Sequence, residues 1–226
     1  MAGSGFGTNF RITTWGETHG AGVGVVVDGC PAGLPLERED VQKYLDRRKP
    51  GQSKYTTQRK EGDQVEILSG IFEGRTTGTP ISMVVYNKDQ RSKDYSNIKD
   101  IYRPGHADFT FDMKYGFRDY RGGGRSSGRE TIGRVAAGAV AAKVLKELGI
   151  EIKAYAKAIA GIEVSKDHFD FAEMNNNPFN MPDKEAAKLV QEKADQMIKE
   201  MDSIGGIIEC QITGMPVGIG ETVFDK

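Results

Sequence analysis

A glycine- and arginine-rich segment, residues 121–134, carries the strongest sign of chemistry in this sequence. It contains five glycines, two serines and four arginines and leads directly into an alanine-rich stretch. Glycines let backbone N–H groups approach a ligand closely, and the start of a helix adds unpaired N–H donors. Arginines add permanently charged, forked donors. The segment therefore predicts a binding site for a multiply charged anion, such as a phosphate or a carboxylate.

A plain helix start is the competing interpretation of this segment. A single serine before a helix would fit it, but three consecutive glycines flanked by Arg125 and Arg129 lose much conformational entropy on folding. The spacings of a dinucleotide-binding motif and of a P-loop are both absent from the segment. We therefore expect an anion site of another kind.

A second cationic stretch lies at residues 47–60. It has no acidic residue, and serine, threonine and tyrosine hydroxyl groups lie among its basic residues. The six cations are Arg47, Arg48, Lys49, Lys54, Arg59 and Lys60. Runs of charge are usually solvated loops, and that is the alternative here. Hydroxyl groups interleaved with cations, however, are suited to binding an anion.

Two of the three histidines lie in loops with similar neighbours. His19 sits in a glycine-flanked turn at residues 16–20, and His106 follows Arg103, Pro104 and Gly105. Histidine titrates near neutral pH and can deliver a proton to a leaving phosphate. A single loop histidine often has only a structural role, but two such loops beside two cationic segments favour catalysis. His168 lacks this context and is expected to be structural or at the surface.

The composition limits the classes of function. The 226 residues include 31 basic and 32 acidic ones, a net charge of −1, which argues against a nucleic-acid-binding protein. The first residues do not resemble a signal peptide, and no apolar run has membrane-spanning length. Cys30 and Cys210 lack metal-ligand spacing, so no metal site is expected. We expect a cytoplasmic protein whose two cysteines are reduced and half-buried.

Strands outnumber helices in the pattern that must position these residues. Strands are expected at residues 9–15, 22–28, 65–72, 80–86, 151–164 and 207–213, and helices at 36–48, from about 127 to 149 and from 183 to about 201. Ser127 and Glu130 have capping-box spacing, and residues 88–108 are expected to form a long functional loop. Since strands and helices do not alternate regularly, the expected fold class is α+β, with β-α-β sandwich-type layers of mainly antiparallel sheet and helices in a single domain, residues 1–226.

Four motifs in the same order resemble the chorismate synthase family. Residues 16–20 and 25–31 resemble its first signature, and residues 46–51 and 55–59 its basic loop. Residues 103–108 resemble its second histidine site, and residues 122–131 its flavin- and substrate-binding signature. Residues 205–206 and 215–221 also fit. The family usually has serine where Thr18 stands, and threonine keeps the hydroxyl group.

The resemblance implies the reaction of that family, the 1,4-elimination of phosphate from 5-enolpyruvylshikimate 3-phosphate to give chorismate, with reduced FMN. It implies that His19 protonates the departing phosphate and that His106 protonates the flavin. The implied substrate contacts are Arg48, Lys54, Arg103 and Arg129, and the implied FMN contacts are Arg125, Ser126, Ser127 and His106. For members that use NADPH to reduce the flavin, the implied NADP contacts are Arg48 and Lys54. The implied assembly is a homotetramer.

Family members continue well beyond the position of Lys226, with an Arg-x-Asp motif and further FMN contacts. The 226 residues are therefore expected to be the N-terminal portion of such an enzyme and, alone, to bind FMN poorly and not to turn over. Three alternatives stay open: a non-catalytic module that binds a phosphate or another anion, a nucleic-acid-binding domain that uses residues 47–60, and a phosphate lyase without a cofactor.

Overall fold

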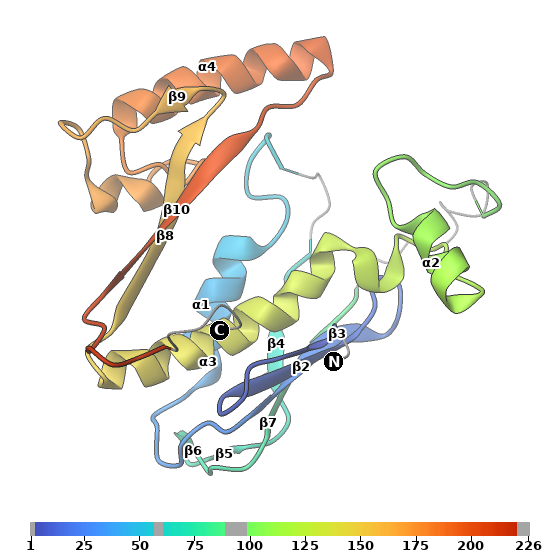
Figure 1. The fold of residues 1–226 in the computed structure, drawn as a ribbon, viewed down its shortest axis with the longest axis vertical. Coiled ribbons are helices and arrows are strands. Elements are labelled where there is room, and N and C mark those ends of the chain that lie inside the picture. Colours follow the sequence, from blue (N-terminus) through green and yellow to red (C-terminus); the bar gives the residue numbers. More distant parts are fainter. Residues whose placement is uncertain (1–2, 57–60, 89–98, 221–226) are drawn as a thin grey trace. The chain divides into compact units, whose positions relative to one another are not determined.

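The computed structural model describes residues 3–56, 61–88 and 99–220 (Figure 1). The chain divides into two compact units. The first unit comprises residues 1–51 and 58–144, and the second comprises residues 52–57 and 145–226. The single domain expected from the sequence stays a prediction.

An antiparallel five-stranded sheet forms the base of the first unit, in the order β1-β2-β3-β7-β4. Its strands are β1 (Gly5–Phe6), β2 (Arg11–Gly16), β3 (Gly22–Asp28), β4 (Val65–Ile67) and β7 (Ile81–Tyr86). The strands β5 (Ile71–Phe72) and β6 (Arg75–Thr76) form a separate small ladder. The helices are α1 (Arg38–Arg48), α2 (Asp108–Tyr115) and α3 (Thr131–Glu147), and the last residues of α3 belong to the second unit.

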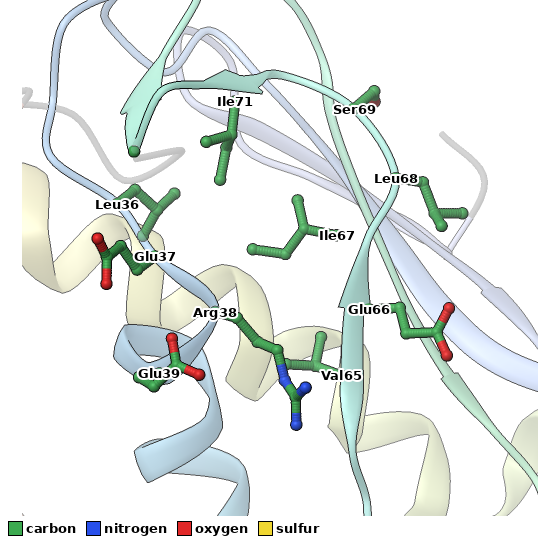
Figure 2. Close-up of a pocket in the computed structure, with 11 residues that line it drawn as sticks. Leu36, Glu37, Arg38, Glu39, Val65, Glu66, Ile67, Leu68, Ser69 and Ile71 are labelled. Carbon is green, nitrogen blue, oxygen red and sulfur yellow. The ribbon is translucent and has the colours of Figure 1, made fainter.

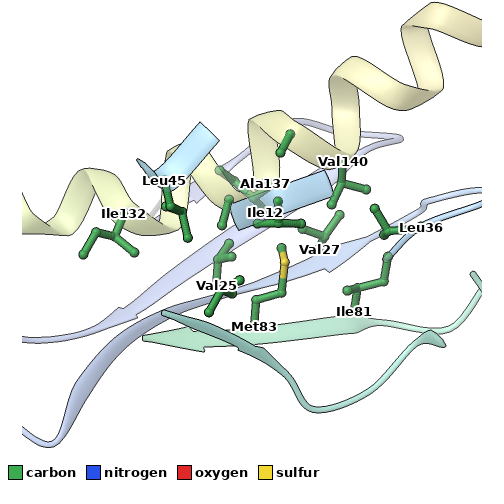
Figure 3. Close-up of a cluster of buried hydrophobic side chains, with 14 of the residues drawn as sticks. Ile12, Val25, Val27, Leu36, Leu45, Ile81, Met83, Ile132, Ala137 and Val140 are labelled. Carbon is green, nitrogen blue, oxygen red and sulfur yellow. The ribbon is translucent and has the colours of Figure 1, made fainter. Parts of the chain in front are cut away.

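The core of the first unit lies between one face of this sheet and the helices α1 and α3 (Figure 3). Alternation along β2 turns Ile12 toward this core, and β3 and α1 add Val25 and Leu45, which are fully buried. The small residues of α3 allow a close approach to the sheet. A Cβ atom built on Gly133 would lie 2.9 Å from the carbonyl oxygen of Gly24 in β3. The start of α3, which carries the glycine-rich segment, is thereby held against the sheet.

The second unit is a three-stranded antiparallel sheet with one helix packed against it. Its strands, in the order β10-β8-β9, are β8 (Glu151–Ile159), β9 (Ile162–Glu163) and β10 (Gly206–Thr213), and its helix is α4 (Lys184–Glu200). Asp183 caps α4, as the sequence predicts: its Oδ1 accepts hydrogen bonds from the backbone N–H groups of Glu185, at 2.9 Å, and Ala186, at 3.0 Å. The core of this unit contains Ala156, Met181 and Val190.

The α+β fold class is confirmed, and every strand pair among the described residues is antiparallel. The predicted strand at 65–72 is wrong in its middle, because Gly70 adopts a left-handed φ of 82° and separates β4 from β5. The half-buried cysteines are also a wrong prediction, since Cys30 is buried and Cys210 is exposed. None of the described helices combines the length and the apolar character that crossing a membrane requires.

Candidate functional site

The glycine-rich segment enters α3 through a backbone that only glycine adopts readily. Gly122, Gly123 and Gly124 have φ values of 62°, 85° and 52°, and 3-10 turns at Gly124–Ser126 and Gly128–Glu130 precede α3. The predicted capping box is wrong. Ser127 Oγ accepts a hydrogen bond from the backbone N–H of Arg129, at 3.3 Å, so it caps the 3-10 turn rather than α3. The glycines therefore serve the turn that presents Arg129.

Arg129 is the most buried cation of the predicted site, with 9% of its side chain exposed. Its Nη1 donates to Asp63 Oδ1 at 2.8 Å, and its Nε donates to Asn87 Oδ1 at 2.8 Å. Its Nη2 is buried and has no hydrogen-bond partner within the described part of the chain. The carboxylate of Glu61 lies 3.7 Å from that nitrogen, beyond hydrogen-bond distance. A buried guanidinium N–H of this kind is suited to receive an anion.

Arg48, at the end of α1, meets the same carboxylate from the other side. Its Nη1 donates to Asp63 Oδ2 at 2.7 Å, so Asp63 joins Arg48 and Arg129, each through one carboxylate oxygen. Burial lowers the pKa of the Arg48 guanidinium from its ordinary value, the charge of Asp63 opposes this and the charge of Arg129 adds to it. Arginine nonetheless stays protonated at any working pH, so both groups remain cations. We call these three residues the Asp63 bridge.

His19 lies in a turn that is tied to the glycine-rich segment. The ring is buried, with 3% of the residue exposed. Asn87 Nδ2 donates to the carbonyl oxygens of Glu17, at 2.9 Å, and Gly20, at 2.8 Å, while its Oδ1 accepts from Arg129. Thr18 Oγ1 donates to the carbonyl oxygen of Gly124 at 3.2 Å. The structure thus brings the His19 turn and Arg129 together through one asparagine side chain.

The loop of Arg103 and His106 reaches the glycine-rich segment as well. A Cβ atom built on Gly123 would lie 3.9 Å from Arg103 Nη2. Arg103 also forms a two-pronged ion pair with Asp108, with Nε and Nη2 at 2.8 and 2.9 Å from its oxygens, and these hydrogen bonds lower the pKa of the Asp108 carboxyl to about 2. His106 is exposed, and its Nδ1 lies 3.1 Å from the carbonyl oxygen of Pro104. Since a carbonyl only accepts, Nδ1 carries the proton of this hydrogen bond.

The guanidinium of Arg125 is hydrogen-bonded to other groups of the protein. Its Nη1 donates to the carbonyl oxygen of Gly16 at 3.0 Å, and its Nη2 lies 2.7 Å from Thr14 Oγ1 and 3.3 Å from Glu130 Oε1. Its guanidinium therefore joins the end of β2 to the start of α3. Ser126 is exposed, and its Oγ donates to the carbonyl oxygen of Gly123 at 2.7 Å.

Lys54 belongs to the second unit, where it pairs with α4. Its Nζ lies 2.7 Å from Asp195 Oδ1, and Tyr55 OH donates to the same carboxylate at 2.9 Å. The hydrogen bond to Asp195 raises the pKa of Lys54. Arg59 and Lys60 of the predicted basic loop lie outside the described residues, as do residues 89–98 of the predicted long loop. His168, which was expected to be structural or at the surface, is exposed, and its Nδ1 lies 3.3 Å from Glu185 Oε2.

Described residues of the first unit line two cavities that bear on the site. The cavity beside Arg125 has a volume of about 940 Å³, and its walls include the side chains of Phe111, Tyr115, Phe117, Tyr120, Arg118 and Arg121. The other has about 640 Å³ and lies between the start of α1 and β4 (Figure 2). Its lining residues include one cation, Arg38, and three carboxylates, Glu37, Glu39 and Glu66. This cavity is therefore unsuited to an anion. Of these two cavities, the one beside Arg125 touches a predicted site residue.

Asp63 and Asn87 are the site residues that the sequence analysis missed. Asp63 follows a run of cations and has a left-handed φ of 41°. Neither feature indicates that its carboxylate pairs with Arg48 and Arg129. Asn87 directly follows a strand end, as many site residues do, and that position is a weak signal. No group of three or more potential metal-binding side chains gathers in the described ranges.

Comparison with known proteins places these motifs in a family. The sequence model of the family described as chorismate synthase matches residues 10–226. A chorismate synthase of Lachnospira eligens is 69% identical over 226 residues, which are all of this chain and 62% of that protein. Those of Chloroflexus aggregans and Methanococcoides burtonii are each 58% identical and are also covered to 62%. The chain thus spans 62% of the length of these relatives.

A solved structure shows the same fold. It is described as the crystal structure of chorismate synthase, and it superposes with a TM-score of 0.70 at 30% sequence identity. The match covers 91% of this chain and 58% of that one. With the family match over residues 10–226, the conclusion is direct: the chain belongs to the chorismate synthase family.

Proposed function

We propose that the whole protein of which this chain forms a part is a chorismate synthase. It is a carbon-oxygen lyase that eliminates phosphate from 5-enolpyruvylshikimate 3-phosphate to give chorismate, in the shikimate pathway toward the aromatic amino acids. The observation that carries the proposal is the Asp63 bridge, with a buried guanidinium N–H of Arg129, next to the buried His19 turn. Permanent cations beside a titratable imidazole are the groups that expulsion of a phosphate requires.

The protein's own contribution to this reaction is charge and a proton. Arg48 and Arg129 hold the substrate phosphate and stabilise the negative charge that grows on it as the C–O bond breaks. Arg103 binds a further anionic group of the substrate from the neighbouring loop. His19 delivers a proton from its ring to the departing phosphate oxygen. Burial of His19 and Arg129 keeps water away, which strengthens these interactions.

The residues around the glycine-rich segment fit reduced FMN. The backbone of Gly122–Gly124 is without side chains, and the neighbouring cavity of about 940 Å³ has aromatic walls and is large enough for a flavin. Ser126, Ser127 and His106 would contact the cofactor, and Arg125 would support this loop from within. When bound, reduced FMN supplies electron density that weakens the C–O bond of the substrate. His106 Nε2 holds or accepts a proton at the flavin side of the site.

The proposed protein also has a reductant for its flavin and a quaternary assembly. NADPH is proposed as one reductant of the flavin, with Arg48 as its contact in the first unit. A cytoplasmic homotetramer is proposed as the assembly, and light scattering of the whole protein checks its mass. The site is not proposed to act on nucleic acids.

The test uses a full-length protein, made by joining residues 1–226 to the remaining part of the Lachnospira eligens relative. We call it the joined protein. Under anaerobic conditions, with FMN reduced by dithionite, it is expected to release phosphate from 5-enolpyruvylshikimate 3-phosphate, and NADPH is tested in place of dithionite. His19→Ala is expected to lower kcat by about 10²- to 10⁴-fold, because general acid catalysis contributes on that scale.

His168→Ala is the matched control for this experiment. His168 is a surface histidine that pairs with Glu185, so its removal should leave kcat unchanged. Loss of phosphate release in His19→Ala alone supports the proposal. A joined protein that binds the substrate but never releases phosphate, or a His19→Ala variant with full activity, contradicts it and favours a non-catalytic anion-binding module.

A further inference from the structure

We propose that Asp63 is a positioning residue that fixes the two phosphate-binding guanidinium groups of Arg48 and Arg129 in one orientation. This inference rests on the proposed function, because it assigns a role within the same site. Asp63 lies outside the motifs that mark the family in the sequence. Its assignment comes from the Asp63 bridge alone.

The geometry of the bridge divides the carboxylate between two cations. Oδ2 accepts from Arg48 Nη1 at 2.7 Å and Oδ1 accepts from Arg129 Nη1 at 2.8 Å. The Asp63 side chain has no exposed surface, and the Arg129 side chain is nine-tenths buried. Each carboxylate oxygen thus accepts a hydrogen bond from one planar guanidinium group, and this bond fixes the orientation of that group. For Arg129 this leaves Nη2 buried and without a hydrogen bond among the residues described.

The backbone of Asp63 is itself held in place. Gln42 of α1 donates through Nε2 to the carbonyl oxygen of Asp63 at 3.1 Å, and its Oε1 accepts from the N–H of Val65 at 3.0 Å. Asp63 has a φ of 41°, a conformation that aspartate adopts more readily than most residues. One buried glutamine therefore holds the backbone on the C-terminal side of this strained residue. Such fixed support is expected where the position of a side chain matters.

Electrostatics explain why a carboxylate is needed here. Two guanidinium groups on one small site, that of Arg129 buried and that of Arg48 partly buried, repel each other and would move apart without a shared anion. Asp63 keeps them together before the substrate binds, so the substrate phosphate meets a preformed pair of donors. The opposing view is that Asp63 only neutralises charge. In that case its removal would raise the positive potential and tighten anion binding, so the two views predict opposite changes.

Glu61 offers a matched control for this difference. It is a second carboxylate beside the same guanidinium, 3.7 Å from Arg129 Nη2, but it makes no hydrogen bond to it. Glu61→Gln therefore removes one negative charge without removing an orienting contact. Asp63→Asn removes one negative charge together with the bridge. A pure charge effect must shift phosphate affinity in the same direction in both variants.

The experiment measures the Kd of inorganic phosphate and of 5-enolpyruvylshikimate 3-phosphate for the joined protein by calorimetry. Asp63→Asn is expected to weaken both by about 10- to 100-fold, since misplacement of a binding group by about 1 Å has effects of that size. Glu61→Gln is expected to leave both Kd values unchanged or to tighten them. The KM of Asp63→Asn should rise by the same factor as its Kd, whereas a merely structural defect would lower the amount of active protein and leave KM unchanged.

Asp63→Glu is the second variant, because it keeps the charge and moves the carboxylate by one methylene group. A positioning role predicts weaker phosphate binding in this variant too. Parental Kd values in Asp63→Glu, or tighter binding in Asp63→Asn, would overturn the role of Asp63. The proposed function fails separately, if the parent joined protein binds neither ligand or releases no phosphate.

Discussion

At the scale of single residues, the ion pair of Arg103 and Asp108 makes stability depend on pH. Its hydrogen bonds lower the pKa of Asp108 from 3.8 to about 2, so the unfolded chain takes up this proton first as the pH falls. The contribution, about 2 kcal/mol, is complete above the unfolded pKa and is lost between about pH 4 and pH 2. In urea denaturation, Asp108→Asn is expected to be less stable than the parent at pH 6, and the difference should vanish near pH 2. An equal difference at both values would contradict this linkage.

Residue types identified the cations and the imidazoles of the candidate site, and geometry supplied the two side chains that hold them, Asp63 and Asn87. Arg129 and His19 are predictable, because cations and imidazoles near glycines suit an anion whatever the fold. Asp63 and Asn87 are not, because their value lies in hydrogen bonds to Arg129 across 66 and 42 residues of sequence. Arg125 shows the converse. Its motif suggests a ligand contact, yet its guanidinium donates to the carbonyl of Gly16 and to Thr14 within the protein.

At the scale of elements, the approach of α3 to β3 controls where the glycine-rich segment lies. Gly133→Ala would place a Cβ 2.9 Å from the carbonyl oxygen of Gly24. This contact is too short, and only a shift of the backbone can relieve it. We expect a loss of about 1–3 kcal/mol in the free energy of unfolding and weaker phosphate binding, because Arg129 shifts with the helix. Urea denaturation and calorimetry measure the two effects.

Gly138→Ala is the control in the same helix. A Cβ at Gly138 meets no atom within 4 Å, so only helix propensity acts there. The free energy of unfolding of this variant is expected to rise by up to about 1 kcal/mol. If Gly133→Ala gained stability by the same amount, the close approach of α3 to the sheet would not constrain the site.

Helices and strands were predictable where a single local signal, such as a hydrophobic run or a capping residue, determines the element. The valines of β3 and the capping aspartate of α4 predicted Gly22–Asp28 and the start of α4 at Lys184. The helix Asp108–Tyr115 was missed, because its Phe, Thr and Asp residues have low helix propensity and tertiary contacts such as the Arg103 pair hold its first turn. Strand breaks at Gly70 and at Ala160, where φ is 54°, depend on local backbone geometry that hydrophobic periodicity does not report.

At the scale of the whole molecule, the chain can be compared in length with its relatives. It spans 62% of the length of the Lachnospira eligens relative, yet it contains both histidine loops, the Asp63 bridge and the glycine-rich segment. The described residues therefore supply most of the cations that a phosphate needs. Under the proposed function, the described residues supply fewer contacts to a flavin, because the guanidinium of Arg125 is engaged within the protein.

This difference predicts that residues 1–226 alone bind FMN weakly. Ser126, Ser127 and His106 are few polar contacts for a cofactor of this size, so we expect a Kd above about 1 μM for the chain and at least tenfold tighter binding by the joined protein. Quenching of flavin fluorescence measures both values, and circular dichroism checks that the chain keeps its helices. Submicromolar affinity of the chain alone would show that its own residues complete the flavin site. Equal affinities of a few micromolar for the chain and the joined protein would mean that the added part of the relative contributes no flavin contact. In that case the 226 residues would already hold every residue that binds the flavin, as well as those that bind the phosphate.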